Sequence, residues 1–235
     1  MIPFSKIAAI SFDAGGTLIR PYPSVGHVYS EILSNHGVTV EPSLLNRSFR
    51  IALKEETTSR REKVTESSEK SYWCRIVRKT IGSTVDNGLF GIIFEDLYET
   101  FASAKRWELI EGAKEILFLA RDLGFRLCVL SNSDQRFRKV FKELNILPFF
   151  EEIFLSSEIG IEKPNTRAFR HVESVLKLSP EELLHVGDSI DHDANGAIAA
   201  GWHHLLVERN QLPDPYRQID SLQEFIPLLE NRTFS

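Results

Sequence analysis

The sequence is poor in cysteine: its 235 residues include two, Cys74 and Cys128, whose spacing matches no metal-binding motif. Cys128 falls in an apolar run, residues 125–130, where it is expected to act as a small buried hydrophobe. No apolar run approaches the roughly 18 residues that a membrane-spanning helix needs. The first residues also lack the basic stretch and long apolar segment of a signal peptide. We therefore expect a reduced, cytoplasmic setting and no membrane partner.

A strong charge of either sign is also lacking. The formal net charge is -5, which is mild for this length and does not suggest a nucleic-acid partner. The apolar fraction of 42% supports a packed globular core. Oligomeric state has no signature in the sequence.

Two regions differ in their hydrophobic pattern. From about Pro21 to Lys105 the pattern is helical, with no convincing strand, and the Ser59 to Lys70 stretch predicts a solvated loop or helix end. A further helix is expected from Ser24 to Asn35. The apolar stripes of the other helices predict the interior of a small helical bundle; they are Leu45, Phe49, Ala52 and Leu53; Trp73, Ile76, Val77 and Ile81; and Leu89, Ile93, Leu97 and Phe101.

From Trp107 onward, predicted strands alternate with predicted helices. With the opening strand before Asp13 this pattern predicts an α/β fold, a parallel five-stranded sheet with both faces covered. The helical region, inserted after the first strand, would then sit above the strand ends as a cap. The expected helices cover residues 113–123, 136–144, 166–176 and 194–200, and the expected strands residues 125–130, 153–155, 183–186 and 204–207.

Polar residues follow the predicted strand ends, where open α/β sheets bind their ligands. Asp13 comes directly after the first strand and can act as a nucleophile that forms an aspartyl phosphate. Gly15, Gly16 and Thr17 then offer close backbone approach and N–H groups to a phosphate. Taken alone, an Asp before a Gly-Gly turn is more often a turn residue.

Two further sites follow along the chain. Ser131 and Asn132 offer a hydroxyl and an amide to a transferring phosphoryl oxygen, although this pair is equally an ordinary turn or helix cap. Lys163, stiffened by Pro164, could neutralise the charge of a phosphate. An isolated loop lysine usually faces solvent.

A fourth site is acidic. Asp188, Asp191 and Asp193 follow a predicted strand and precede a helix, which suits a hard cation such as Mg²⁺. Asp188 is the best ligand candidate, and Asp193 could orient the groups around it. Acidic residues are also favoured at a helix N-terminus without any metal.

Together, these sites resemble in order the four motifs of the haloacid dehalogenase-like superfamily, and the resemblance covers nearly the whole chain. It extends into the helical region, through residues 23–29 and 36–37. The resemblance implies a Rossmann-like core with strand order 5-4-1-2-3, formed by residues 1–19 and 106–235, and a helical cap formed by residues 20–105.

The resemblance also implies roles for individual residues. Asp13 would be the catalytic nucleophile, with Lys163 as a second catalytic residue. Ser131 and Lys163 would bind the phosphate, and Gly16, Thr17 and Asn132 are further phosphate-binding candidates from the chemistry described above. The metal, Mg²⁺, would be held by Asp13, the backbone carbonyl of Gly15 and Asp188, and Asp193 is a further metal-site candidate from its place in the acidic cluster.

The sequence departs from the superfamily at Gly15. The superfamily's phosphatases read Asp-x-Asp-Gly-Thr, and their second Asp is the general acid, which this chain replaces with Gly15. General acid–base catalysis contributes about 10²- to 10⁴-fold, or roughly 3 to 5 kcal/mol of barrier. Its loss would slow hydrolysis of alkyl phosphates far more than that of acyl or aryl phosphates. Asp191, His192 or Asp193 are candidates for a replacement base.

We therefore expect a Mg²⁺-dependent phosphohydrolase that acts on a small phosphorylated metabolite through an aspartyl phosphate. One alternative is a protein that binds a phosphorylated ligand with little or no turnover. Another is a phosphonatase-like carbon–phosphorus hydrolase that uses a cap lysine. A dehalogenase is disfavoured, because the superfamily's 2-haloacid dehalogenases lack the metal-binding Gly-Asp pair, which this chain keeps as Gly187 and Asp188. The candidate cap lysines are Lys54, Lys63, Lys70 and Lys79, and the candidate specificity residues are Arg20, Tyr22 and Arg50.

Overall fold

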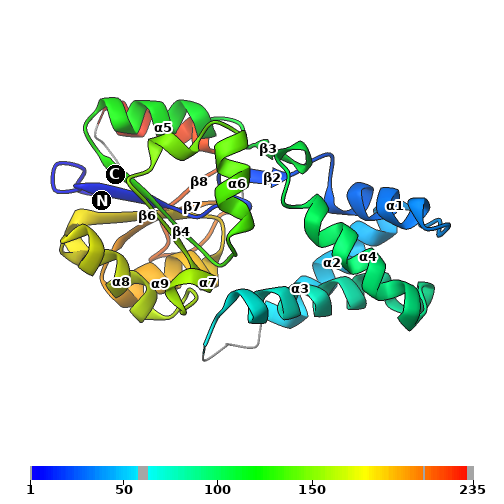
Figure 1. Cartoon of the computed structure of the whole chain (residues 1–235). Helices are drawn as coiled ribbons and strands as arrows, with labels where there is room; N and C mark the ends of the chain where they lie inside the picture. Colours follow the sequence, from blue (N-terminus) through cyan, green and yellow to red (C-terminus); the bar gives the residue numbers. More distant parts are fainter. Residues whose placement is uncertain (1, 58–62, 209, 232–235) are drawn as a thin grey trace.

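The core of the computed structural model is a parallel sheet of six strands (Figure 1). The structure describes residues 2–57, 63–208 and 210–231. Across the sheet the strands are β5 (Glu152–Leu155), β4 (Arg126–Ser131), β1 (Ala9–Phe12), β6 (Leu183–Gly187), β7 (His203–Val207) and β8 (Gln218–Ile219). The α/β class and the parallel sheet are as predicted.

The predicted number of five strands is wrong, because β8 extends the sheet beyond β7. It pairs in parallel through two positions, Leu206 with Gln218 and Val207 with Ile219. A strand of two residues has no alternation of apolar and polar positions, so no periodic signal predicts it.

Helices cover both faces of this sheet, as Figure 1 shows for α5 on one side and α8 and α9 on the other. Ile10 and Phe12 of β1 pack into the apolar cluster of α5 and α10, whereas Ala9 packs into the cluster of α8 and α9. Alternate residues of a buried strand thus serve opposite layers. The helices around the sheet are α5 (Ala113–Asp122), α6 (Arg136–Glu143), α7 (Ser156–Ile159), α8 (Thr166–Leu176), α9 (Asn195–Ala200) and α10 (Leu222–Glu230).

Four further helices form a separate group beside the sheet, which we call the four-helix unit (Figure 1). They are α1 (Val25–Asn35), α2 (Pro42–Thr57), α3 (Glu66–Ile81) and α4 (Asn87–Thr100). The chain leaves the core through β2 (Ile19–Pro21) and returns through β3 (Trp107–Leu109), and these two strands pair antiparallel. The expected cap boundaries, after residue 19 and before residue 106, lie beside this pair of strands.

Local signals explain where these helices begin. The Ser24 side chain accepts a hydrogen bond from the His27 N–H at the start of α1, and Thr65 forms a capping box with Ser68 at the start of α3. Asp86 accepts from two backbone N–H groups at the start of α4. The shorter helical turns are η1 (Gly82–Thr84), η2 (Ala104–Arg106), η3 (Leu147–Phe149), η4 (Pro180–Glu182) and the π-helical η5 (Ile190–Ala194).

The stretch from Ser59 to Lys70 includes a helix end, one of its two predicted forms, but the prediction that it is solvated is wrong at Glu69. Residues 58–62 lie outside the described residues, but from Glu66 onward the chain is helical, and Glu69 is 1% exposed. Glu69 accepts a hydrogen bond from the Ser156 hydroxyl at 3.0 Å, and Glu66 accepts one from the Ser157 hydroxyl. Charge density alone predicted solvent exposure, because the partners lie about ninety positions further along the chain.

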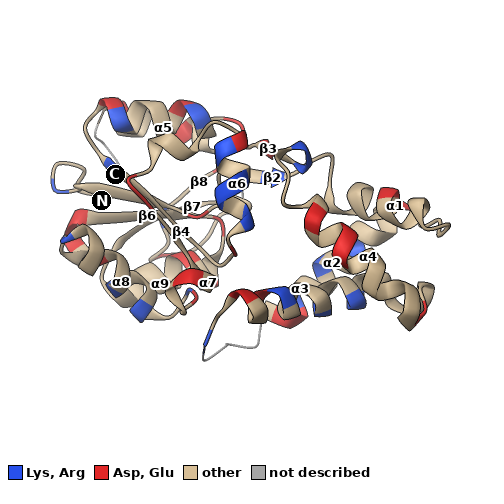
Figure 2. Cartoon of the chain, in the orientation of Figure 1, with Lys and Arg blue, Asp and Glu red and all other residues tan. Residues whose placement is uncertain are grey.

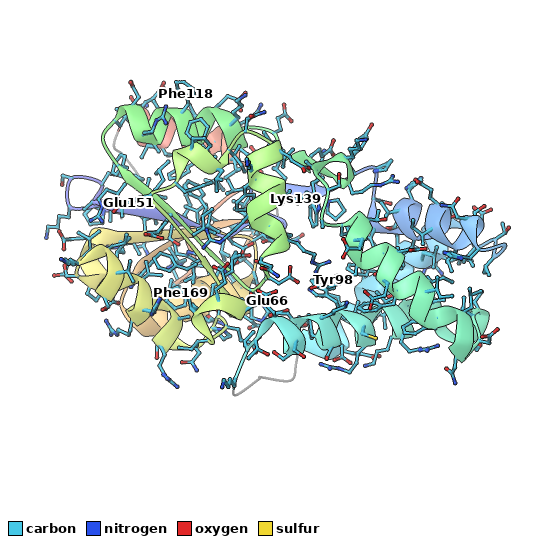
Figure 3. All side chains as sticks on the ribbon, in the orientation of Figure 1. Glu66, Tyr98, Phe118, Lys139, Glu151 and Phe169 are labelled. Atoms are coloured by element: carbon cyan, nitrogen blue, oxygen red, sulfur yellow. The ribbon has the colours of Figure 1, made fainter. Side chains whose placement is uncertain are left out.

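The four-helix unit therefore makes polar contacts with the core. Beside the Glu66 and Glu69 contacts, the Tyr98 hydroxyl donates to Asp134 Oδ2 at 3.2 Å. Figure 3 shows Glu66 and Tyr98 where the unit meets the core. Most charged segments of the ribbon lie on helices and loops, and the central strands are largely uncharged (Figure 2). None of the helices in the described ranges has the length and apolar character to span a bilayer.

Candidate active site

A cavity of about 660 Å³ lies between the carboxyl ends of the central strands and the four-helix unit. Asp13 follows β1, Ser131 ends β4 and Asp188 follows β6, and all three line this cavity. Lys163 lines it from the segment between α7 and α8. Because parallel strands end at one edge of the sheet, residues far apart in the sequence meet here.

Lys163 lies between two carboxylates. Its Nζ donates to Asp13 Oδ1 at 2.8 Å and to Asp193 Oδ1 at 2.5 Å, and the residue is 2% exposed. Burial alone would lower the pKa of Lys163, but Asp13 and Asp193 hold that pKa above its usual value. Lys163 is therefore a buried ammonium group, unlike the isolated loop lysine that usually faces solvent.

Asp193 is fully engaged by groups of this chain. Its Oδ1 accepts from Lys163 and lies 3.0 Å from His185 Nε2, while its Oδ2 accepts from the Ser189 N–H at 2.9 Å. Burial opposes ionisation, but Lys163 and His185 lower the pKa of Asp193. This arrangement suits Asp193 to positioning Lys163. It suits direct ligation of a metal, one of the two roles predicted for Asp193, less well.

His185 is a site residue that the sequence did not indicate. It is 1% exposed, and its Nδ1 lies 3.1 Å from the Ser11 hydroxyl. Burial, followed by the charge of Lys163, lowers the pKa of His185, so its ring is neutral next to the ammonium. Within the strand pattern His185 stands at an ordinary buried position, and no motif marks it.

The carboxylates of Asp13, Asp188 and Asp193 form a cluster whose ligand atoms lie within 4.8 Å of one another. Thr17 donates to Asp188 Oδ1 at 3.1 Å. Burial and the charges of Asp13 and Asp193 raise the pKa of Asp188 to about 7. Three carboxyl groups lie close together around a single ammonium, so the cluster could bind a divalent metal ion.

Backbone shape brings these groups together. Gly16 has a φ of +98°, and a Cβ there would collide with the Asp188 carboxylate. A Cβ on Gly187 would likewise collide with the side chain of Asp193. Gly15 is different, because a Cβ there would have one neighbour, Phe137 Cζ, at an ordinary distance of 4.0 Å.

Two predicted phosphate-binding side chains have other partners. Asn132 accepts from the Lys163 N–H at 2.7 Å and donates to the Lys163 carbonyl at 2.8 Å, so it clamps the lysine segment. Thr17 is not among the residues that line the cavity, and its hydroxyl binds Asp188. Ser131 and Gly16 do line the cavity.

The remaining candidates separate in the same way. His192 lines the cavity, whereas Asp191 is exposed and accepts from Asn195 at 3.3 Å. Arg50 lines the cavity, whereas Arg20 pairs with Glu108 and Tyr22 is 50% exposed. Of the four candidate lysines Lys54 lines the cavity, Lys70 pairs with Glu95, Lys79 pairs with Glu55, and Lys63 is exposed.

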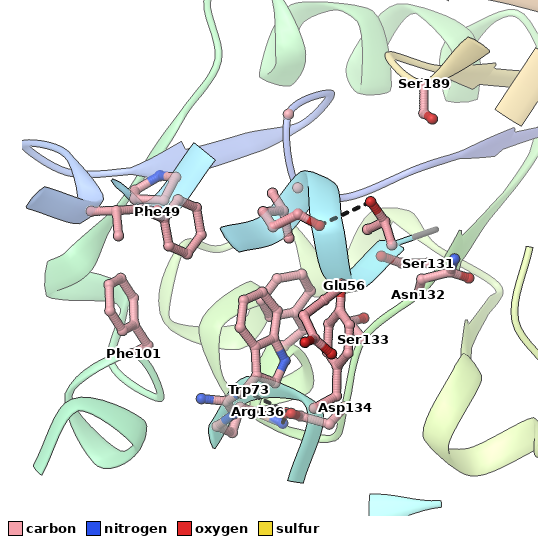
Figure 4. A pocket seen from close by; sticks show the side chains of 18 of the residues that line it. Phe49, Glu56, Trp73, Phe101, Ser131, Asn132, Ser133, Asp134, Arg136 and Ser189 are labelled. Atoms are coloured by element: carbon pink, nitrogen blue, oxygen red, sulfur yellow. Dashed lines mark hydrogen bonds and ion pairs between the residues drawn. The ribbon is translucent and has the colours of Figure 1, made fainter. Parts of the chain in front are cut away.

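The side of the cavity opposite the carboxylates is aromatic. Figure 4 shows Phe49, Trp73 and Phe101 on one side of the cavity, and Ser131 and Asn132 on the other. Phe49, Trp73 and Phe101 were expected in the interior of a helical bundle, but each is only partly buried, whereas Ile93 and Leu97 are buried as expected. A helical stripe shows which face avoids solvent, and cannot distinguish a core from a cavity.

The fold and the site define a haloacid dehalogenase-like hydrolase, and the chain belongs to that family, whose pattern matches residues 7–201. It is 29% identical over 214 residues to human haloacid dehalogenase-like hydrolase domain-containing protein 3, covering 89% of this chain and 85% of that protein. It is 35% identical over 100 residues to a glyceraldehyde 3-phosphate phosphatase from Methanopyrus kandleri, covering 42% of each chain.

Among solved structures, the HAD-hydrolase YfnB from Bacillus subtilis, bound to magnesium, has the same fold. The TM-score is 0.72 at 19% identity, with 95% of this chain and 99% of that chain covered. The predicted resemblance to the superfamily is confirmed. The roles of individual site residues remain predictions.

Proposed function

We propose that this protein is a Mg²⁺-dependent phosphohydrolase that acts on a small phosphorylated metabolite through an aspartyl phosphate on Asp13. The observation that carries the proposal is the pairing of Asp13 with the buried Lys163 ammonium at the floor of the cavity. A phosphatase among the relatives supports the same class of reaction. The four-helix unit would act as the cap, spanning residues 20–105, and would contribute side chains that contact the substrate.

Mg²⁺ fits the donor set of this site. Asp13 and Asp188 would hold it, with the backbone carbonyl of Gly15 as a third ligand, because Mg²⁺ prefers hard oxygen ligands. Bound there, it would neutralise charge on the phosphoryl oxygens and on the carboxylates. Asp193 would act through Lys163, since both of its oxygens already accept hydrogen bonds.

The chain's own residues would carry two displacement steps. A carboxylate oxygen of Asp13 attacks phosphorus, the bond from phosphorus to the ester oxygen breaks, and the leaving group departs with that electron pair. Water then attacks phosphorus, the bond to Asp13 breaks, and inorganic phosphate and the free carboxylate result. Lys163 and Ser131 would stabilise negative charge on the phosphoryl oxygens in both steps.

Protonation of the leaving group is where this site differs from the superfamily's phosphatases. Gly15 has no side chain to donate a proton, so the leaving group must depart as an anion or take its proton from water. Of the candidate replacements, His192 and Asp193 line the cavity, but both oxygens of Asp193 already have partners, so His192 is the group we propose to activate water. The expected result is a low rate with alkyl phosphates and a higher rate with activated ones.

Acetyl phosphate tests this proposal, because its leaving group needs no acid and makes few contacts. We expect release of phosphate that requires Mg²⁺, stops with EDTA, and is abolished in Asp13→Asn. Thermal stabilisation by phosphate and Mg²⁺ without any release from acetyl phosphate or p-nitrophenyl phosphate would instead support the phosphate-binding alternative. Borohydride trapping of a Lys54 adduct with phosphonoacetaldehyde would support the carbon–phosphorus hydrolase.

A further inference from the structure

We propose that the cavity selects phosphate monoesters of phenols, that is, substrates whose leaving group is an aryl alcohol. This inference rests on the proposed phosphohydrolase function and names its substrate class. Two features that meet at Gly15 carry it: a wall of aromatic side chains and the space left by the missing acid.

The aromatic wall consists of five rings that line the cavity and contact one another in sequence. From α2 toward the core, successive ring centroids lie 6.1, 6.2, 5.9 and 5.1 Å apart, each pair edge to face. This geometry is the one that aromatic pairs favour, so each ring helps to hold the next in place. The members of the aromatic wall, in this order, are Phe49, Tyr29, Phe101, Trp107 and Phe137.

The aromatic wall ends beside Gly15. Phe137 Cζ lies 4.0 Å from the point that a Cβ of Gly15 would occupy, which is van der Waals distance. An acid at position 15 would protonate the ester oxygen, so that oxygen is expected close to this point. The first carbon atoms of a leaving group would therefore lie against a ring, and not against a carboxylic acid.

The chemistry of the leaving group agrees with this surface. A phenol has a pKa of about 10, as in tyrosine, whereas an alkyl alcohol is nearer to bulk water at about 15.7. A phenolate can therefore depart without a proton donor, while an alkoxide needs one. The lack of an acid at Gly15 therefore slows the hydrolysis of an aryl phosphate less than that of an alkyl phosphate.

The polarity of the cavity favours the same class. A sugar phosphate carries several hydroxyl groups, each of which loses water on binding and needs a new partner. The aromatic wall offers such partners at few points, because most of its surface is hydrocarbon. A phenyl ring, in contrast, gains apolar contact and edge-to-face packing.

The experiment compares phenyl phosphate with cyclohexyl phosphate, which has nearly the same size but a much more basic leaving group. We expect kcat/KM for phenyl phosphate to be at least about 10²-fold higher. Glucose 6-phosphate is expected to be poorer still. A series of substituted phenyl phosphates should give a kcat that rises as the leaving-group pKa falls.

Two variants locate the effect in the aromatic wall. Phe137→Ala, and Phe137→Leu as the milder change, should raise KM for phenyl phosphate by a larger factor than for acetyl phosphate, with circular dichroism confirming a folded chain. Phe118→Ala is the matched control, since Phe118 is 56% exposed on α5 and away from the cavity. It should change neither KM.

The outcomes separate the two proposals. Equal or better turnover of cyclohexyl phosphate or glucose 6-phosphate, with acetyl phosphate hydrolysis that still depends on Asp13, would overturn the substrate class and leave the phosphohydrolase standing. Equal effects of Phe137→Leu on both substrates would also overturn it. Absence of any turnover that depends on Asp13 would overturn both proposals.

Discussion

The two sides of the cavity are built in opposite ways. On the core side, Asp193 lies within hydrogen-bond distance of three groups, Lys163 bridges two carboxylates, and the backbone at Gly16 and Gly187 has no room for a Cβ. Facing these groups, the aromatic wall is largely apolar, and its rings are partly exposed except for the buried Tyr29; Trp107 and Phe137 come from the core and the other rings from the four-helix region. One side is charged and tightly constrained, and the other is largely apolar, although Arg50, Lys54 and Glu56 of α2 also line the cavity.

This difference separates two tasks. Interlocking hydrogen bonds hold charged groups within the narrow tolerance that bond-making chemistry needs. Apolar contacts are not directional, so the affinity of a ligand for an apolar surface depends on the shape and polarity of the ligand. Gly15 lies at the junction, because it occupies a motif position of the core but borders Phe137.

The largest expected effect tests whether the chemistry resides on the core side. Asp13→Asn removes the nucleophile and should lower phosphate release from acetyl phosphate by about 10³-fold or more. Residual turnover within tenfold of the original, in a variant with unchanged circular dichroism, would break the comparison. The assay is steady-state phosphate release with saturating Mg²⁺.

The next effect tests the junction. Gly15→Asp should raise turnover of alkyl phosphates by about 10²- to 10⁴-fold, because it supplies a general acid. The new side chain has room, since its Cβ would lie 4.0 Å from its nearest neighbour, Phe137 Cζ. Gly16→Ala is the matched control: its Cβ would strike Asp188 at a φ of +98°, so activity should fall. A Gly15→Asp variant that is folded but no faster with cyclohexyl phosphate would contradict this account.

A smaller effect tests how the two sides are joined. Glu69→Ala should lower the free energy of unfolding by about 1–3 kcal/mol, because it deletes a buried hydrogen bond between α3 and the core. Glu95→Ala removes an exposed ion pair with Lys70 and should cost about 0–1 kcal/mol. Urea denaturation measures both variants. An equal loss of unfolding free energy in both variants would show that the buried Glu69 contact stabilises the protein no more than the exposed ion pair does.

The smallest effect concerns the far edge of the core. Burial, followed by the charges of Arg217 and His203, lowers the pKa of His204 from 6.5 to about 4. The unfolded chain binds this proton first as pH falls, so the contribution of His204 to stability is present above about pH 6.5 and is lost between pH 6.5 and 4.

His204→Gln keeps an acceptor for the Arg217 N–H and removes the titration. Between pH 7 and 4 its melting temperature should therefore fall less than that of the unaltered protein, by about 2–4 °C. Parallel thermal melts at the two pH values provide the measurement. Identical pH dependence in both proteins would mean that acid sensitivity arises elsewhere.

Much of the core was predictable because its signals are local. The helix expected at residues 166–176 matches α8 (Thr166–Leu176), where apolar periodicity coincides with an Asn165 cap. The parallel sheet followed from alternation of strands and helices. The sequence did not predict α10, whose interior contains Pro227, or the two-residue β8.

For the site, the sequence predicted which residues gather at the cavity better than it predicted their hydrogen-bond partners. Asp13, Lys163 and Asp188 were found because a motif names them, and the structure brings all three to one cavity. Asn132 and Thr17 are polar residues at motif positions, yet their side chains bind Lys163 and Asp188. Residue type predicts that a hydrogen bond will form, but its partner depends on tertiary structure.

The pairing of β2 with β3 bears on how such a protein can change over time. The chain departs for the four-helix unit and returns from it at adjacent points, held by three residue pairs from Ile19 with Leu109 to Pro21 with Trp107. Because the ends of the insertion are already joined, its length and helix arrangement place little entropic burden on the sheet. An insertion of another length or helix arrangement could therefore replace the four-helix unit at this position without displacing the residues at the strand ends.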